Sequence, residues 1–236
     1  AGRWGEARVR WRGSPGRRPD SDEEQGRGGE GVADGGDVDG GVAERQAAIR
    51  IRPRYWRSYM TLGLVYYRAG RYREALDPYR RATELQPNEP SPFANLGTMY
   101  HLLGDITQAI GNYEHAVRLG PSASAYANLA LVYYRANRLD DARNAYEQSL
   151  AANPKSVLTH RNLGDVYKRL GETAKAKAEY QQAIAIGDAL VKVNPRDMRT
   201  IALIALCEAK LVRSAAADRH ADEQHDHPGG KPESDP

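Results

Sequence analysis

Cysteine is nearly absent from this chain, which has one, Cys207, among 236 residues. A single thiol excludes an internal disulfide framework and favours a reducing compartment, so we expect a cytoplasmic protein. Long apolar runs are also missing, since no stretch approaches the roughly 18 residues that a membrane-spanning helix needs. The arginines near the N-terminus are not followed by an apolar core, so they do not form a signal-peptide pattern.

The motifs of common catalytic and metal sites are absent as well. The sequence has no glycine-rich phosphate loop after a strand and no GxSxG, HExxH or CxxC motif. His220, His225 and His227 have a spacing that matches no structural metal site. We therefore predict that the protein is not an enzyme and that it has no catalytic residue, no metal site and no cofactor.

Glycine and charge are distributed unevenly along the chain. The net charge of +3 combines a basic centre, residues 42–217, with acidic segments on either side. Residues 1–41 contain more than half of the 23 glycines and few large apolar side chains, so burial cannot offset the entropy of ordering them. We predict a disordered leader over 1–41 and a disordered polar tail over 218–236.

Between these segments the sequence repeats with a period of 33 or 34 residues. A Leu-Gly or Leu-Ala pair marks each unit, with an aromatic residue or His three positions before the Leu and a Tyr four positions after it. A block of the form Ala-x3-Tyr follows, and Pro closes the first three units. The pairs begin at Leu62, Leu96, Leu129 and Leu163, and the second blocks begin at Ala75, Ala109, Ala142 and Ala176.

Each unit has the pattern of two helices. Apolar residues recur at helical spacing, and a break such as RAGR or LLGD falls in the middle of the unit. The small residues allow close helix crossing and the aromatic residues fill the adjoining space. One such hairpin cannot bury its apolar face alone, whereas a stack of hairpins can.

This pattern resembles the tetratricopeptide repeat, whose signature is W-x2-L-G-x2-Y, then A-x3-F, then P. Here Tyr, Phe or His replaces the Trp and Tyr replaces the Phe, over residues 56 to about 190. The resemblance implies an all-α fold, a right-handed α-solenoid of antiparallel helix pairs with a C-terminal capping helix. The long final helix also resembles repeat arrays attached to bacterial multidomain signalling proteins.

The spacing and the resemblance together predict an order of segments. The expected segments after the leader are a lead-in or partial repeat helix (42–55), four repeats (56–89, 90–122, 123–156 and 157–196, the last with an extended second helix), a capping helix (197–217) and the tail.

The resemblance also implies a binding site, because first helices of this family line a concave groove that holds peptides. In three repeats the residue directly before the marker Leu is Asn, and these form a ladder whose amides can both donate to and accept from a peptide backbone. The rest of the face becomes basic toward the C-terminal end, which suits an acidic peptide or a C-terminal carboxylate; a solvated charged face is the alternative. The candidate groove residues are Tyr67, Arg68, Asn95, Thr98, His101, Asn128, Leu131, Tyr134, Arg135, Asn162, Asp165, Lys168 and Arg169.

Our leading functional hypothesis is a non-catalytic scaffold or adaptor that binds an extended segment of a protein partner in this groove. The alternative is the regulatory or substrate-recruiting repeat region of a larger bacterial enzyme or transcription regulator. Single-stranded RNA binding would use the basic core, but the small-residue and Tyr signature disfavours it. We therefore expect a protein or peptide partner, neither nucleic acid nor a membrane, and make no prediction of oligomeric state.

Overall fold

Helices account for the regular structure of the described part of the chain. The computed structural model describes residues 38–225, with side chains as far as Arg213, and within this range it has ten helices and no strand. The all-α prediction is confirmed. Residues 1–37 and 226–236, which belong to the predicted leader and tail, lie outside the described residues. The helices are α1 (Val38–Ile51), α2 (Trp56–Arg68), α3 (Tyr72–Leu85), α4 (Pro90–Leu102), α5 (Ile106–Leu119), α6 (Ala123–Arg135), α7 (Leu139–Ala152), α8 (Val157–Arg169), α9 (Thr173–Val193) and α10 (Met198–His225).

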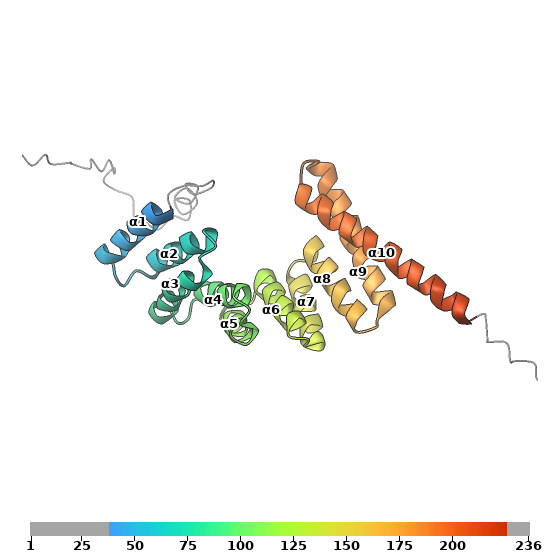
Figure 1. Cartoon of the computed structure of the whole chain (residues 1–236), viewed down its shortest axis with the longest axis horizontal. Helices are drawn as coiled ribbons and strands as arrows, with labels where there is room; N and C mark the ends of the chain where they lie inside the picture. Colours follow the sequence, from blue (N-terminus) through green and yellow to red (C-terminus); the bar gives the residue numbers. More distant parts are fainter. Residues whose placement is uncertain (1–37, 226–236) are drawn as a thin grey trace, which may run out of the picture. The chain divides into compact units, whose positions relative to one another are not determined.

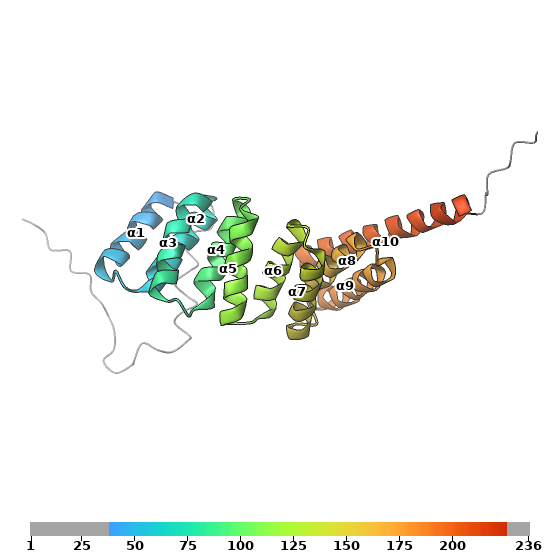
Figure 2. The ribbon, with the colours of Figure 1, turned by 90° about the horizontal axis from the view of Figure 1, so that it is seen from below.

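The helices stack in chain order as antiparallel pairs (Figures 1 and 2). The most extensive contacts lie within the pairs α2–α3, α4–α5, α6–α7 and α8–α9, and smaller contacts join each second helix to the next first helix. First helices of neighbouring pairs also touch, as α4 with α6 and α6 with α8. The stack is an α-solenoid, as predicted, with the first helices on its inner side (Figure 1).

The signature residues form the interface inside each pair. Gly63 of α2 faces Tyr79 of α3 so closely that an added β-carbon would lie 2.6 Å from the ring. Gly164 and Tyr180 repeat this arrangement in the fourth pair, at the same distance. The rings are almost fully buried, so the small residue is what lets the two helix axes approach.

The turn inside each pair requires a left-handed residue. Gly70, Gly104 and Gly171 have φ of +72°, +84° and +80°, and Asn137 takes the same role with φ of 62°. Asn is the non-glycine residue that most readily adopts this conformation, so the third turn follows the same rule with a different residue.

The N-terminal helix begins earlier than predicted. α1 starts at Val38, whereas the sequence predicted a disordered leader as far as residue 41. It has 14 residues, like α3, α5 and α7, and its bounds are those of α3 shifted by 34 positions. Asp39 stabilises its first turn, because a carboxylate there complements the helix dipole, and it accepts a 2.9 Å hydrogen bond from Arg71. α1 therefore has the length and the 34-residue offset of a second helix, but it lacks the extensive packing on the following helix that α3, α5 and α7 have.

The C-terminal end also differs from prediction. α9 is extended to 21 residues, and α10 packs along it and reaches α8. An added β-carbon on Gly187 would lie 2.7 Å from Ile204, which shows how closely the two helices cross. The predicted end of the cap at residue 217 is wrong, because α10 continues to His225. Residues 218–225 contain neither Pro nor Gly, so nothing in them terminates a helix before Pro228.

No helix between residues 38 and 225 is both long enough and apolar enough to cross a membrane.

Candidate partner-binding groove

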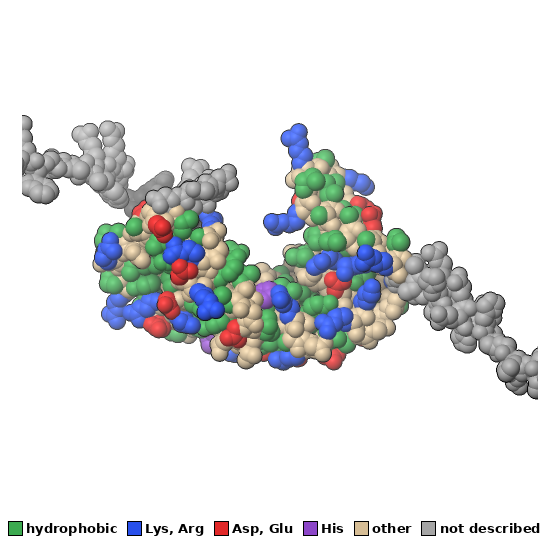
Figure 3. Space-filling view, in the orientation of Figure 1, with side chains coloured by type: hydrophobic (Ala, Val, Ile, Leu, Met, Phe, Trp, Pro, Cys, Tyr) green, Lys and Arg blue, Asp and Glu red, His purple; other side chains and the backbone are tan. Residues whose placement is uncertain are grey.

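The inner face of the stack is a concave surface that carries basic side chains (Figure 3). It is formed by α2, α4, α6 and α8, the helices on which the sequence placed the candidate site (Figure 1). Three residues of the N-terminal half expose apolar surface: Leu64 at 37%, Tyr67 at 39% and Leu102 at 43%. The groove thus combines an apolar end with a basic end.

The predicted Asn ladder is only partly available to a ligand. Asn128 is exposed and Asn95 half-exposed, and neither side chain has a hydrogen-bond partner among the described residues. Asn162 differs, because its Oδ1 accepts a 3.1 Å hydrogen bond from Arg161 Nε and a second bond from the same guanidinium. Two of the three amides can therefore meet a peptide backbone without breaking an existing contact.

Two other candidate residues serve the packing between helices. Thr98 and Asp165 occupy equivalent positions in the second and fourth repeats. Thr98 Oγ1 lies 2.9 Å from the Tyr113 hydroxyl, and Asp165 accepts a 2.7 Å hydrogen bond from the Tyr180 hydroxyl. Asp165 also binds Lys210 of α10 at 2.5 Å. Leu131, at the same position in the third repeat, offers no polar atom and is half-buried.

Arginines at the ends of the first helices reach back to the preceding first helix. Arg135 Nη1 lies 3.0 Å from His101 Nε2. Arg169 donates to the Tyr134 carbonyl at 3.1 Å, binds Asn137, and places its guanidinium 4.7 Å from the centre of the Tyr134 ring. His101 and Tyr134 are equivalent in the two repeats, so the contact recurs along the groove. Burial, followed by the Arg135 charge, lowers the pKa of His101, so its neutral ring accepts the hydrogen bond.

The sequence analysis did not predict these contacts of Arg135 and Arg169 with the preceding repeat. Their signal was the recurrence of Arg at the last position of α2, α6 and α8, which we assigned to ligand binding alone. Arg68 is the first of these, and it also has an interaction partner. Tyr67 and Lys168, at the position that His101 and Tyr134 occupy in the middle repeats, are exposed.

Several arginines outside the groove are paired with carboxylates, and the groove arginines are not. Outside the groove, arginines such as Arg80, Arg81 and Arg138 each lie within 2.8 Å of a carboxylate on the same helix or its first turn. Inside it, Arg135 and Arg169 are held by neutral acceptors, and no carboxylate of the described residues pairs with them. The groove therefore retains positive charge on side chains whose positions are already fixed.

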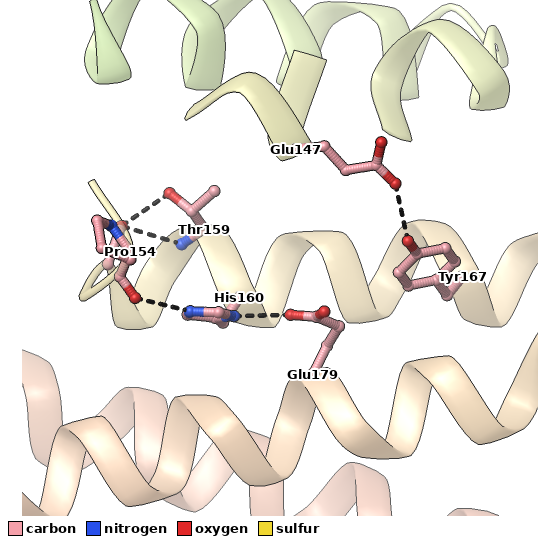
Figure 4. Close-up of polar contacts among 7 residues, drawn as sticks. Glu147, Pro154, Thr159, His160, Tyr167 and Glu179 are labelled. Atoms are coloured by element: carbon pink, nitrogen blue, oxygen red, sulfur yellow. Dashed lines mark hydrogen bonds and ion pairs between the residues drawn. The ribbon is translucent and has the colours of Figure 1, made fainter. Parts of the chain in front are cut away.

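Polar contacts below the groove fix α8 against its neighbours (Figure 4). His160 Nδ1 lies 2.6 Å from Glu179 of α9, and its Nε2 lies 3.0 Å from the Pro154 carbonyl. These acceptors, Glu179 foremost, raise the pKa of His160. The Tyr167 hydroxyl donates to Glu147 of α7 at 2.9 Å, as Tyr133 does to Glu114 one repeat earlier at 2.6 Å. The basic end of the groove therefore rests on a fixed helix.

The fold and the groove define a class: an α-solenoid of helix hairpins that serves as a protein-interaction scaffold. Family models agree with this assignment. One model, described as tetratricopeptide repeat, matches residues 92–155 and 122–189, and a second, described as TPR repeat, matches 63–104. The chain belongs to the tetratricopeptide repeat family.

Individual relatives are more distant. The uncharacterized protein ycf37 of Pyropia yezoensis is 31% identical over 64 residues, which are 27% of this chain and 36% of that protein. The chain thus matches only about a third of that relative's length.

Solved structures show the same fold. The crystal structure of MamA has a TM-score of 0.63 at 22% identity and covers 66% of this chain and 92% of its own. YrrB, described as a TPR protein with an unusual peptide-binding site, has a TM-score of 0.57 at 21% identity over 70% of this chain and 81% of its own. TTC0263, a TPR protein of Thermus thermophilus, has a TM-score of 0.57 at 20% identity over 73% of this chain and 91% of its own.

Proposed function

We propose that the protein is a non-catalytic scaffold whose groove binds an extended, acidic segment of a partner protein. The observation that carries this proposal is the unequal pairing of its arginines. Arg80 and Arg81 of α3 and Arg143 of α7 are neutralised by carboxylates of their own helices, whereas Arg135 and Arg169 contact only neutral groups. A carboxylate of a ligand would supply the charge that these two lack.

The remainder of the groove supports an extended ligand. The free amides of Asn95 and Asn128 lie one repeat apart on neighbouring first helices and can bind backbone groups at successive points along a peptide. The exposed Leu64, Tyr67 and Leu102 provide an apolar surface for one end of it. The buried free thiol of Cys207 supports a reducing, cytoplasmic location.

The charge component is tested with a labelled oligoglutamate peptide followed by fluorescence anisotropy. We expect Arg135→Gln with Arg169→Gln to weaken binding about tenfold per arginine, since a charge-assisted hydrogen bond contributes about 1.5 kcal/mol. The matched control, Arg80→Gln with Arg81→Gln, removes the same charge from outside the groove and should leave affinity within about twofold. Equal losses in the two variants would refute a groove site.

The amide component is tested with single substitutions in the same assay. Asn95→Ala and Asn128→Ala should weaken binding, because each removes a free donor and acceptor. Asn162→Ala should change it less, because Arg161 already occupies that amide. An equal effect of all three would show that the ladder acts as the sequence alone suggested, without regard to the Arg161 contact.

A further inference from the structure

A basic and aromatic turn lies at the start of the array, between α1 and α2. Ile51 is 79% exposed and Tyr55 45% exposed, on either side of Pro53. Arg50, Arg52, Arg54 and Arg57 are exposed around them, and none forms an ion pair within residues 38–225. We call the segment 50–57 the basic turn.

Packing of the repeats does not require this composition. The residues 34 positions later in the next repeat are Glu84 for Arg50, Gln86 for Arg52 and Asn88 for Arg54. Tyr55 corresponds to Glu89, the residue before α4. The sequence has no acidic residue between Glu44 and Glu74, so the basic turn lies in a wholly cationic stretch. Single basic residues recur at two of these positions, Arg118 at that of Arg50 and Lys155 at that of Arg54, but among the turns between repeats this one alone has arginines at all three.

The backbone of the turn is held in one conformation. The Tyr55 amide donates to the Arg52 carbonyl at 3.1 Å, and the Tyr59 hydroxyl donates to the Pro53 carbonyl at 2.9 Å. The turn lies on the same edge of the array as the α3–α4 and α5–α6 turns (Figure 2). It is separate from the groove, whose candidate residues begin at Tyr67 in the last turn of α2.

We propose that the basic turn binds the surface of an anionic phospholipid membrane. The arginines contact lipid phosphates, while Ile51 and Tyr55 enter the interface between headgroups and acyl chains. This site goes beyond the groove function, since a scaffold held at a membrane by one edge keeps its concave face free for a partner. It departs from the sequence-based expectation of no membrane partner, which considered only spanning segments and signals.

The exposed side chains favour a membrane over single-stranded nucleic acid. Nucleic-acid binding of this kind relies on aromatic faces on which bases stack. The Trp56 ring is half-buried and already covered by the Arg57 guanidinium at 5.4 Å from its centre, which leaves Tyr55 as the single exposed aromatic ring of the turn. The most exposed apolar residue of the turn is Ile51, which has no stacking face but gains from transfer into an acyl environment.

The test is sedimentation of the full chain with vesicles of phosphatidylcholine containing about 30% phosphatidylglycerol, beside pure phosphatidylcholine vesicles. We expect binding only to the anionic vesicles, and a loss of about 25-fold in Arg52→Gln with Arg54→Gln, since each basic residue near such a surface contributes about fivefold. Arg80→Gln with Arg81→Gln, which removes the same charge from exposed positions of α3 away from the turn, is the matched control and should bind normally.

A second variant separates insertion from charge attraction. Ile51→Ser should weaken binding to anionic vesicles and leave the helical circular dichroism unchanged, because the side chain is exposed and supports no packing. Equal binding of wild type, Arg52→Gln/Arg54→Gln and the control would overturn the proposal. So would the absence of vesicle binding together with oligonucleotide binding that the same two substitutions abolish, which would make the turn a nucleic-acid site.

Discussion

A single methyl group on Gly164 tests whether the close approach of helices sets the stability of the array. In Gly164→Ala the new β-carbon would lie 2.6 Å from Cε1 and 2.8 Å from Cδ1 of Tyr180. The ring has little freedom to retreat, since Tyr180 is 1% exposed and its hydroxyl is hydrogen-bonded to Asp165, which in turn binds Lys210. The helices themselves must therefore separate.

The magnitude follows from two opposing effects. Replacing Gly by Ala in a helix gains about 1 kcal/mol, whereas overpacking a filled core costs about 1–3 kcal/mol. For Gly164 the short contacts place the cost at the upper end, so we expect a net loss of about 1–2 kcal/mol. For Gly97, where the corresponding contact with Tyr113 is 3.0 Å, the two effects should nearly cancel. The third repeat has a fully buried Ala130 at this position, so the array can accommodate a methyl group where the ring has adapted to it.

The assay is urea unfolding followed by circular dichroism, with hydrogen exchange to localise the change, because repeat arrays need not unfold in one step. Gly164→Ala should lower the midpoint and speed exchange in α8 and α9, and Gly97→Ala should do neither. If Gly164→Ala were as stable as wild type while Gly97→Ala was destabilised, the contact distances would not govern stability and the reasoning would fail.

Two further predictions concern other helices. Pro78→Ala in α3 should raise the urea midpoint, with a net gain in stability of about 1 kcal/mol. The regained helix hydrogen bond contributes about 3 kcal/mol, whereas the two lost buried methylene groups cost about 1.6 kcal/mol and the added entropy of the unfolded chain costs up to about 1 kcal/mol. A fall in the midpoint would show that packing of the proline ring is essential. Pairing with Glu179 raises the pKa of His160 in the folded protein. The pair therefore stabilises the fold fully at pH values below 6.5, the ordinary pKa of histidine, and this stabilisation is lost as the pH rises through the raised pKa. The urea midpoint should fall over that range. His160→Tyr, which can keep the bond to Pro154 as Tyr59 does to Pro53, should remove this pH dependence, and an unchanged pH profile would contradict the assignment.

The sequence predicts the stack well because the packing rule is local and repeated. A small residue on the first helix and a Tyr on the second meet within one hairpin, as Gly63 and Tyr79 do, and the pairing recurs in each unit. The ends were harder to predict, because no repeat signature stands before α1 in the sequence to mark it, and because α10 ends on polar residues that are also good helix formers.

The groove was predictable as a surface but not in its contacts. The position of Thr98 and Asp165 points toward the inner face, yet both side chains bond to a second-helix tyrosine. Arg135 is held because the preceding repeat has His101, a hydrogen-bond acceptor, near the end of its first helix. His101 can accept this bond because burial lowers its pKa and keeps the ring neutral. Such contacts depend on pairs of variable positions, which periodicity does not describe.

The repeats also supply their own control for separating packing from function. Where all units agree, as at the buried Ala75, Ala109, Ala142 and Ala176, the residue is explained by the hairpin interface. Where one unit departs and a contact within the array explains the departure, as for Asp165 with Lys210, the residue is structural. The basic turn differs from the turns between repeats in combining Arg50, Arg52 and Arg54, with no such contact, on an edge that packing leaves exposed. A departure of this kind has its reason outside the described array, and the vesicle experiment asks whether that reason is a membrane.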